Sequence, residues 1–328
     1  MKLITREILP KNIVFVTGIT RSGKALLLPI LASLTNADKA SADFFYEQVP
    51  TLYEMGLMDE DAASFLLSFG MNMKIYEDYL GRNSNFRPND ISSVWSFSEP
   101  YSYIERLSRK EGEFAFREIE KPRNNPKLFP MMIHNALLNA EIWFKSIPSL
   151  KMIHMQRSPI DLIYSWSKKG YGSLGFNDSL RNMTLTFKYK NHALPYWAKD
   201  WEEDYLYKSD IDRIIYSINH IRKKSLESYN KLKTKENILF INHLDITTKT
   251  SESLSQICEF VGESRTSSTS EVLIRENCPR DLTKNIPFST NNLNIDQKIL
   301  ELKKITSSSS FKFLMHMEEE FNSGSISV

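Results

Sequence analysis

A glycine-bounded segment near the N-terminus has the residue types and spacing of a phosphate-binding loop. Gly18-Ile-Thr-Arg-Ser-Gly23-Lys24 lies between two apolar runs. Glycines let the backbone turn so that successive N–H groups point into one concavity, and a following helix adds partial positive charge. We predict that the following residues contact a phosphate group of a ligand: Gly18, Thr20, Arg21, Ser22, Gly23, Lys24 and Ala25.

The residue after the loop lysine separates two kinds of phosphate chemistry. Nucleoside triphosphatases place Ser or Thr there to hold Mg²⁺. This chain has Ala25, whose side chain offers no ligand atom. The sequence therefore favours a phosphate-bearing ligand used without Mg²⁺, and we predict no metal site.

A second candidate anion site follows another apolar run. Arg157 comes at the end of the run, Ser158 can cap a following helix, and Ser165 lies two turns into that helix. An arginine and a hydroxyl beside a helix N-terminus can bind phosphate. In the alternative, Arg157 pairs with a carboxylate and Ser165 is an ordinary helix residue. The residues alone leave both interpretations open.

Together the two segments resemble the donor-binding motifs of sulfotransferases. Arg21-Ser-Gly-Lys resembles the family's 5′-phosphosulfate loop. Arg157-Ser-Pro-Ile-Asp161-Leu-Ile-Tyr-Ser165 resembles the 3′-phosphate motif, R-x-P-x-D-x-x-x-S. Residues 238–244 and 254–262 are similar to later family segments. The chain departs from the family in having Lys24-Ala25 where two hydroxyl residues are usual, and in lacking the late acidic motif.

The resemblance implies a reaction and a cofactor. The donor is 3′-phosphoadenosine-5′-phosphosulfate, the acceptor is a hydroxyl group, the nucleotide product is 3′,5′-adenosine bisphosphate, and no metal is required. A fixed cation near the departing phosphate lowers the barrier to transfer. We expect Arg21, and second to it Lys24, to supply that charge.

The acceptor hydroxyl must lose a proton, and two residues are candidates for the base. His134 lies 23 residues before Arg157, where the uronyl 2-O-sulfotransferase branch has a catalytic histidine. Glu47 lies shortly after the first helix, where other carbohydrate sulfotransferases have a catalytic glutamate. Each also has a structural alternative, His134 as a helix-surface residue and Glu47 as a solvated charge.

Two other classes of function remain open. An ATP-dependent P-loop kinase would also bind phosphate at residues 18–24, although it would need Mg²⁺. A nucleotide-binding protein without catalytic activity could retain the same fold.

Several further segments could contact the acceptor or the donor. Residues 82–90 contain two arginines, and residues 189–207 contain Trp197, Trp201 and several tyrosines. Flat rings with polar neighbours suit a saccharide acceptor, although the same aromatics could pack a helical lid. Arg275, Arg280 and Lys284 form a basic segment. Solvated faces are expected at residues 222–224 and 318–320, and His154 is expected in the core.

Apolar periodicity predicts the elements that position these residues. We expect strands at residues 12–17, 114–118, 150–156 and 237–242. We expect helices at residues 26–34, 47–79, 131–145, 159 onward, 212–229 and 254–261. Residues 81–90 form a polar loop, and the composition of residues 266–270 and 307–310 is typical of linkers. The alternation predicts an α/β fold, with three layers, a central parallel sheet and helices on both faces.

Composition limits the remaining possibilities. The 328 residues contain 42 Lys and Arg against 40 Asp and Glu, so the formal charge of +2 favours no nucleic-acid polymer as partner. Two cysteines, Cys258 and Cys278, are too few for a disulfide framework. The longest apolar run, residues 25–34, is too short to span a membrane. We expect a cytoplasmic protein without a signal peptide, one domain over residues 1–321 and a flexible tail at 322–328.

Overall fold

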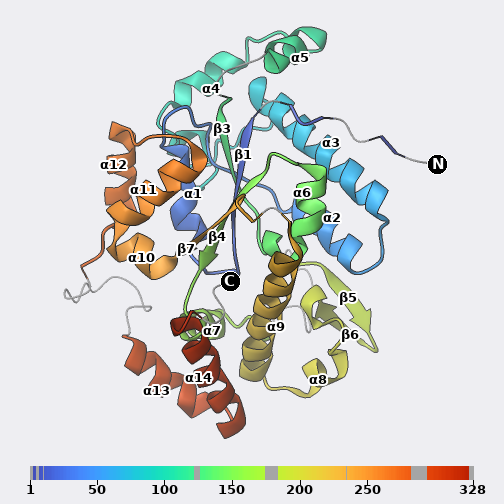
Figure 1. Cartoon of the computed structure of the whole chain (residues 1–328), viewed down its shortest axis with the longest axis vertical. Helices are drawn as coiled ribbons and strands as arrows, with labels where there is room; N and C mark the ends of the chain where they lie inside the picture. The colour runs from blue at the N-terminus through green and yellow to red at the C-terminus, as the bar shows by residue number, and fades with distance from the viewer. Residues whose placement is uncertain are drawn as a thin grey trace.

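The fold is described from a computed structural model of the whole chain. It describes residues 3–4, 7–9, 11–121, 126–173, 184–233, 235–281 and 294–324. Figure 1 shows a central sheet with helices on both sides and a group of helices below it.

Five parallel strands form the central sheet. Their order is β2-β3-β1-β4-β7, with every neighbouring pair parallel. The strands are β1 (Asn12–Thr17), β2 (Ser41–Ala42), β3 (Leu128–Met132), β4 (Lys151–Gln156) and β7 (Ile238–Asn242). Because carboxyl ends of parallel strands share one edge, the segments that follow β1, β3, β4 and β7 meet there.

The apolar sequence of β1 explains why both faces of the sheet are covered. Ile13 and Phe15 point to one side, and Val14 and Val16 point to the other, because strand side chains alternate. All four are fully buried. Burial of such a side chain contributes about 1.5–3 kcal/mol, so a strand of this composition is stable only between two layers.

Helices complete the two outer layers. The first face packs against α2 (Phe45–Glu54), α3 (Glu60–Tyr79), α5 (Glu113–Glu120) and α6 (Ala140–Ser146). The second packs against α1 (Lys24–Ala32), α10 (His243–Thr248), α11 (Thr250–Val261) and α12 (Ser267–Arg275). A short α4 (Pro100–Arg106) lies next to α5 at the top of Figure 1. The expected three-layer α/β fold is confirmed.

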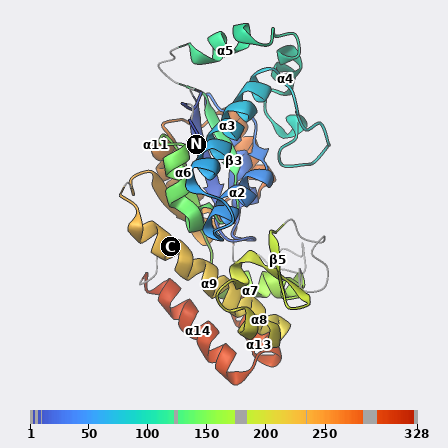
Figure 2. The same ribbon diagram turned by 90° about the vertical axis from the view of Figure 1, so that its right-hand side faces the viewer.

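A third group of helices lies beyond the carboxyl edge of the sheet. It contains α7 (Pro159–Lys168), α9 (Asp210–Lys231), α13 (Ile295–Ile305) and α14 (Ser308–Asn322), which share an apolar cluster. Figure 2 shows α14 running beside α9. A separate hairpin, β5 (Thr186–Tyr189) and β6 (His192–Pro195), packs with α8 (Glu202–Tyr207).

The strands that flank the two phosphate motifs were predicted correctly, whereas the region between them was not. Residues 114–118 form part of helix α5, not a strand. Ala115 and Ile119 are its buried residues, four positions apart, and so lie on one helical face. The predicted helix at 131–145 is instead the end of β3, a 3₁₀ turn (Ala136–Asn139) and α6. Different elements bury its evenly spaced apolar residues in the same core.

Two segments of linker-like composition are helix starts. Thr266 caps α12 through a capping box with Thr269. Ser307 caps α14 by accepting a hydrogen bond from the backbone N–H of Ser310. Hydroxyl residues favour loops and helix N-caps for the same reason, since they bond the nearby backbone. The predicted helix at 47–79 is likewise divided between α2 and α3.

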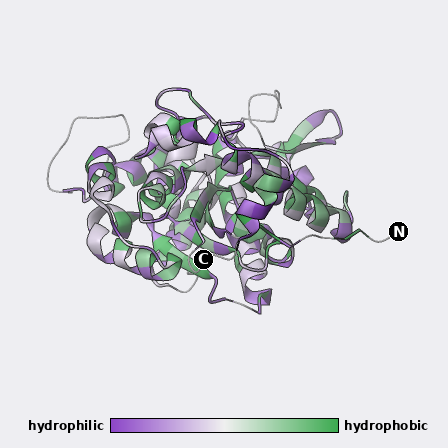
Figure 3. Cartoon of the chain, turned by 90° about the horizontal axis from the view of Figure 1, so that it is seen from above, coloured by the Kyte–Doolittle hydropathy of each residue, from purple (hydrophilic) through white to green (hydrophobic). Residues whose placement is uncertain are grey.

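Hydropathy follows the layers. Seen from above, hydrophobic residues (green) occupy much of the sheet, and hydrophilic residues (purple) recur on the outer loops and helix faces (Figure 3). Within the described ranges, no helix has the length and apolar character needed to cross a bilayer. Residues 325–328 of the predicted tail lie outside the described residues, and α14 extends to Asn322.

Candidate active site

The loop between β1 and α1 forms a cradle that requires glycine at two positions. Gly18 and Gly23 have φ values of 136° and 108°, which residues with a Cβ rarely adopt. A Cβ on Gly18 would lie 2.5 Å from the carbonyl oxygen of Met155, and one on Gly23 would lie 2.5 Å from Cδ2 of His243. The loop is therefore packed closely between the ends of β4 and β7.

Lys24 is folded back into this loop. Its Nζ donates hydrogen bonds to the carbonyl oxygens of Gly18 and Ile19, each at 2.8 Å, and the residue is 3% exposed. Burial lowers the pKa of the ammonium to about 7, with a smaller lowering by Arg21, although Glu47 acts in the opposite direction. An added negative charge at the loop would restore the protonated form.

The other loop residues differ in exposure. Arg21, at φ 75°, and Ala25 are exposed, whereas Ser22 is buried and its hydroxyl has no partner among the described residues. The carbonyl of Thr20 accepts a hydrogen bond of 2.8 Å from Trp166 Nε1. The loop is thus attached to α7 as well as to the sheet.

The second motif adopts the predicted helix start and contacts the loop directly. Ser158 caps α7 through the backbone N–H of Asp161. Arg21 Nε donates to Ser165 Oγ at 3.0 Å, and Arg157 Nη1 donates to the carbonyl oxygen of Arg21 at 2.8 Å. The two candidate anion sites therefore form one continuous surface, although 144 residues separate Arg21 from Ser165.

Arg157 also faces a carboxylate, as the alternative interpretation of the sequence expected. Arg157 Nε lies 3.4 Å from Asp161 Oδ2, and Lys298 Nζ lies 2.6 Å from the other oxygen, Oδ1. Burial by itself would raise the pKa of Asp161, but Arg157 and Lys298 outweigh burial and the pKa is lowered. Asp161 is therefore charged at neutral pH and shared by two cations.

His243 lies against the same group of charges. Burial lowers its pKa to about 3, with further lowering by Arg157, Arg280 and Lys298. The ring is neutral at physiological pH and fills the space above Gly23. It thus connects the loop to the cationic cluster, which we define as Arg21, Arg157, Arg280 and Lys298.

These residues fit an anionic nucleotide with phosphates at two positions. The cradle at Gly18 and Gly23 presents backbone and the start of α1 to one phosphate. In the cationic cluster, Arg157 and Lys298 contact Asp161, and Arg21 and Arg280 lie close enough to Arg157 to act on its charge, which offers a place for a second phosphate. No group of three or more metal-ligating side chains occurs within the part of the chain that the structure describes.

The two candidate bases meet at the end of β3. Glu47 Oε1 accepts a hydrogen bond of 2.7 Å from the backbone N–H of His134 and lies 2.8 Å from its Nδ1. Because a carboxylate only accepts, we assign the ring proton to Nδ1, which leaves Nε2 able to take a proton. Phe44 stacks on the ring at 5.6 Å.

The charge state of His134 suits a base. Burial lowers its pKa, as does Lys24, while Glu47 opposes both. The ring is therefore neutral at pH 7 and can accept a proton. His134 follows β3 in a loop and does not begin a helix, which brings it to the same sheet edge as the phosphate loop.

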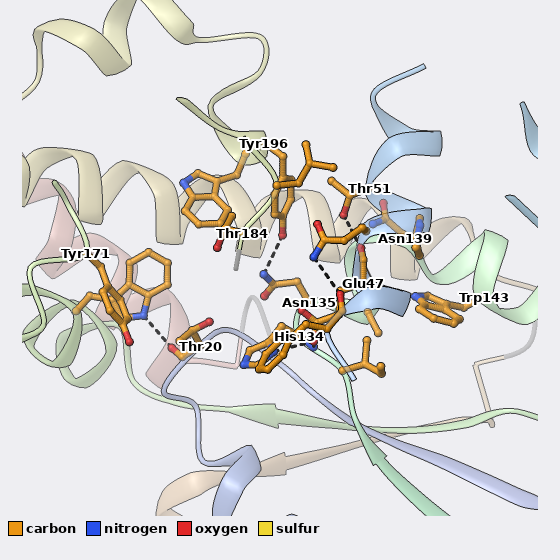
Figure 4. Close-up of a pocket in the computed structure, with 18 residues that line it drawn as sticks. Thr20, Glu47, Thr51, His134, Asn135, Asn139, Trp143, Tyr171, Thr184 and Tyr196 are labelled. Atoms are coloured by element: carbon orange, nitrogen blue, oxygen red, sulfur yellow. Dashed lines mark hydrogen bonds and ion pairs between the residues drawn. The ribbon is translucent and has the colours of Figure 1, made fainter. Parts of the chain in front are cut away.

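A cavity of about 280 Å³ opens over this pair. Thr20 and Tyr171 lie at one end and Trp143 and Asn139 at the other, with Glu47 and His134 between them (Figure 4). Asn135 Nδ2 donates to the hydroxyl of Tyr196 across the cavity at 3.0 Å. Six aromatic residues line it: Phe44, Trp143, Trp166, Tyr171, Tyr196 and Trp197. Among the residues that the structure describes, no lysine or arginine lines the cavity.

Some of the segments proposed to contact the acceptor line the cavity, and others lie away from it. Tyr196 and Trp197 line the cavity, whereas Trp201 and Tyr205 pack against each other near α9. Residues 82–90 do not line it, and Arg82 pairs with Glu111. Arg280 contributes to the cationic cluster, Arg275 pairs with Glu276, and Lys284 lies outside the described residues.

Two charge runs predicted to be solvated contain buried members. Arg222 is 6% exposed and Glu318 is 8% exposed. Glu318 Oε2 accepts hydrogen bonds from Ser158 Oγ at 2.8 Å and from the backbone N–H of Ile160 at 3.0 Å. The prediction was wrong for these two residues, because the sequence of a charge run does not show which helical face will be packed, whereas Lys223 and Glu319 are exposed as expected. His154 is buried as expected, and burial lowers its pKa to about 3.

Sequence reasoning missed several residues of the site. Asn135, Trp143 and Tyr171 line the cavity, and Lys298 belongs to the cationic cluster. Asn135 lies three residues after β3, so recognising residues 128–132 as a strand would have placed it at the carboxyl edge of the sheet. Nothing local distinguishes Lys298 from the neighbouring lysines of α13.

A model of the sulfotransferase domain matches residues 11–323. The sulfotransferase domain of the Synechococcus olefin synthase is 13% identical, with 98% of each chain covered and a TM-score of 0.42. A Mycobacterium avium sulfotransferase is 10% identical, with 90% of this chain and 76% of that chain covered and a TM-score of 0.41.

A mouse sulfotransferase crystallised with PAP is 13% identical, with 96% of this chain and 86% of that chain covered and a TM-score of 0.39. No curated protein matches the chain.

Proposed function

Because this chain belongs to the sulfotransferase family, we propose that it transfers a sulfuryl group from 3′-phosphoadenosine-5′-phosphosulfate to a hydroxyl acceptor. The observation that carries the proposal is the continuity of the two anion sites through Arg21, which contacts both Ser165 and Arg157. That surface lies at the same sheet edge as the Glu47–His134 pair.

The chain's own residues divide the binding of the donor. The cradle from Gly18 to Ala25 would hold the 5′-phosphosulfate, and Arg157 with Ser165 would hold the 3′-phosphate. When bound, the donor supplies an activated sulfuryl group and leaves as 3′,5′-adenosine bisphosphate. Arg21 and Lys24 would stabilise the negative charge that develops on the departing phosphate, since fixed cations are most effective where water is excluded.

His134 would act as the base and Glu47 would position it. Nε2 takes the proton of the acceptor hydroxyl as its oxygen attacks. Glu47 holds the ring in the tautomer with Nδ1 protonated and stabilises the cation that forms. The two residues therefore form one catalytic unit, and general-base catalysis of this kind contributes about 10²–10⁴-fold to a rate.

The cavity supports a neutral acceptor that carries a ring. Its aromatic side chains suit a flat apolar surface, and Asn135, Asn139 and Thr51 offer polar groups for hydroxyls. With Glu47 in the wall and no lysine or arginine among the described lining residues, an anionic acceptor would be repelled. An uncharged saccharide meets these requirements.

The alternative kinase function would use the phosphate loop differently. A kinase would need a hydroxyl at position 25 for Mg²⁺, and alanine offers none. A non-catalytic nucleotide-binding protein would have no need for the ordered Glu47–His134 pair.

The proposal is tested by incubating the protein with the donor and a panel of neutral hydroxyl compounds in the presence of a chelator. We expect acceptor-dependent release of 3′,5′-adenosine bisphosphate, and its loss in His134→Gln. In a parallel incubation with ATP in place of the donor and without chelator, product formation that requires Mg²⁺ would support the kinase instead. Donor binding without turnover on any acceptor would support the non-catalytic alternative.

A further inference from the structure

We propose that Lys298, on helix α13, is a second cation of the site for the 3′-phosphate of the donor nucleotide. The inference rests on the proposed function and deepens it, because it assigns a residue far outside the recognised motifs. Lys298 lies 137 residues beyond Asp161, to which it is hydrogen-bonded.

Arg157 shares its carboxylate partner, Asp161, with a second cation. A guanidinium paired with a single carboxylate is largely neutralised and attracts a phosphate weakly. Here Asp161 also faces Lys298, and the Lys298 contact of 2.6 Å is much shorter than the Arg157 contact of 3.4 Å. Because Lys298 bonds Oδ1 and Arg157 faces Oδ2, the single negative charge of Asp161 is shared between two cations and does not neutralise Arg157 alone.

Lys298 is held in place by burial and by the contacts of its helix. Its side chain is 12% exposed, although lysine side chains are usually mobile and solvated. Glu301, one turn further along α13, accepts hydrogen bonds from Tyr164 at 3.1 Å and Lys168 at 2.7 Å. Both donors belong to α7, the helix that begins after Arg157.

The adjoining helix strengthens this attachment. Glu318 of α14 accepts hydrogen bonds from Ser158 and Ile160 in the first turn of α7. The pair α13–α14 thus contacts α7 at its start, at Asp161 and near its end. Figure 1 shows the pair lying next to α7. Lys298 therefore cannot move away from Asp161 unless α13 and α14 separate from α7.

The cationic cluster holds more positive than negative charge around Arg157. Arg280 and Arg21 add to the charge felt by Arg157, and Asp161 is the acidic residue that acts on it. Collecting like charges costs free energy in the absence of a partner. A phosphate group at the cluster would offset that cost, which ties Lys298 to ligand binding as well as to folding.

The test compares two nucleotides that differ only in the 3′-phosphate. Binding of 3′,5′-adenosine bisphosphate and of adenosine 5′-monophosphate is measured by calorimetry for the unmodified protein, Lys298→Met and Lys303→Met. Lys303 is exposed on the same helix and is the matched control. Melting temperatures show that each variant is folded.

We expect Lys298→Met to weaken bisphosphate binding about 10-fold or more and to leave monophosphate binding within about 2-fold, since the variant removes a charge-assisted contact to the 3′-phosphate alone. Lys303→Met should change neither. Equal losses for both nucleotides, or no loss, would overturn the assignment. If instead the unmodified protein does not prefer the bisphosphate, the proposed function fails, and the two failures are distinguishable.

Discussion

Glu47 Oε1 lies 2.8 Å from His134 Nδ1 and also accepts a hydrogen bond from the backbone N–H of His134. The sequence presents these residues as competing bases, 87 positions apart. Their contact makes them one unit, in which the carboxylate orients the ring and leaves Nε2 able to accept a proton.

A unit of this kind predicts non-additive kinetics. We expect His134→Gln to lower kcat by about 10²–10⁴-fold and Glu47→Gln by a smaller factor, because the imidazole remains. The double variant should be no slower than His134→Gln, since residues acting together are not additive. Multiplied effects in the double variant would show two independent roles.

Because the pKa of Lys24 is lowered, we expect the protein to take up a proton when the donor product binds. The pKa of about 7 in the free protein makes Lys24 mostly neutral at pH 8, and an anionic ligand beside it raises the pKa. Binding at pH 8 should therefore take up nearly one proton, and affinity should fall as pH rises above 7. Calorimetry in buffers of different ionisation enthalpy measures this uptake, which should vanish in Lys24→Met. An unmodified protein with no uptake would contradict the prediction.

The close packing of Gly23 against His243 predicts that a larger residue at position 23 weakens donor binding. Alanine at Gly23 would bring its Cβ within 2.5 Å of His243, whereas alanine at Gly262 would meet nothing within 4 Å. Both positions have positive φ, so both variants carry a backbone strain of about 1–2 kcal/mol. We expect only Gly23→Ala to weaken nucleotide binding, by 10-fold or more. Equal nucleotide affinities in the two variants would exclude a special role for this contact.

The two hydrogen bonds that Glu318 accepts predict that its substitution lowers stability more than substitution of the neighbouring Glu319. Glu318→Gln weakens two hydrogen bonds to the start of α7, so it should lower the free energy of unfolding by about 1–2 kcal/mol. Glu319→Gln is the control, because Glu319 is exposed. Chemical denaturation measures both. A similar small effect in the two variants would mean that Glu318 does not stabilise α7.

The motifs could be predicted because their signals are local. A buried strand, a glycine turn and an N-capped helix are each encoded within about ten residues, so the segments around Arg21 and Arg157 were found correctly. Short apolar runs do not separate a buried strand from a helix, and residues 114–118 and 131–145 were assigned incorrectly for that reason.

Tertiary contacts were not predictable from local patterns. The Glu47–His134 pair, the contact of Arg21 with Ser165 and the approach of Lys298 to Asp161 all depend on which strands share an edge. The same holds for Glu318, whose burial depends on α14 packing against α7. Recognising residues 128–132 as a strand would have placed His134 at this edge.

The measurement that tests the central claim most directly is calorimetry of 3′,5′-adenosine bisphosphate against ATP with Mg²⁺, for the unmodified protein and Arg157→Met. The account predicts tighter binding of the bisphosphate, and loss of most of that preference in the variant. Tighter binding of ATP, or unchanged bisphosphate binding in Arg157→Met, would contradict the two-site donor pocket.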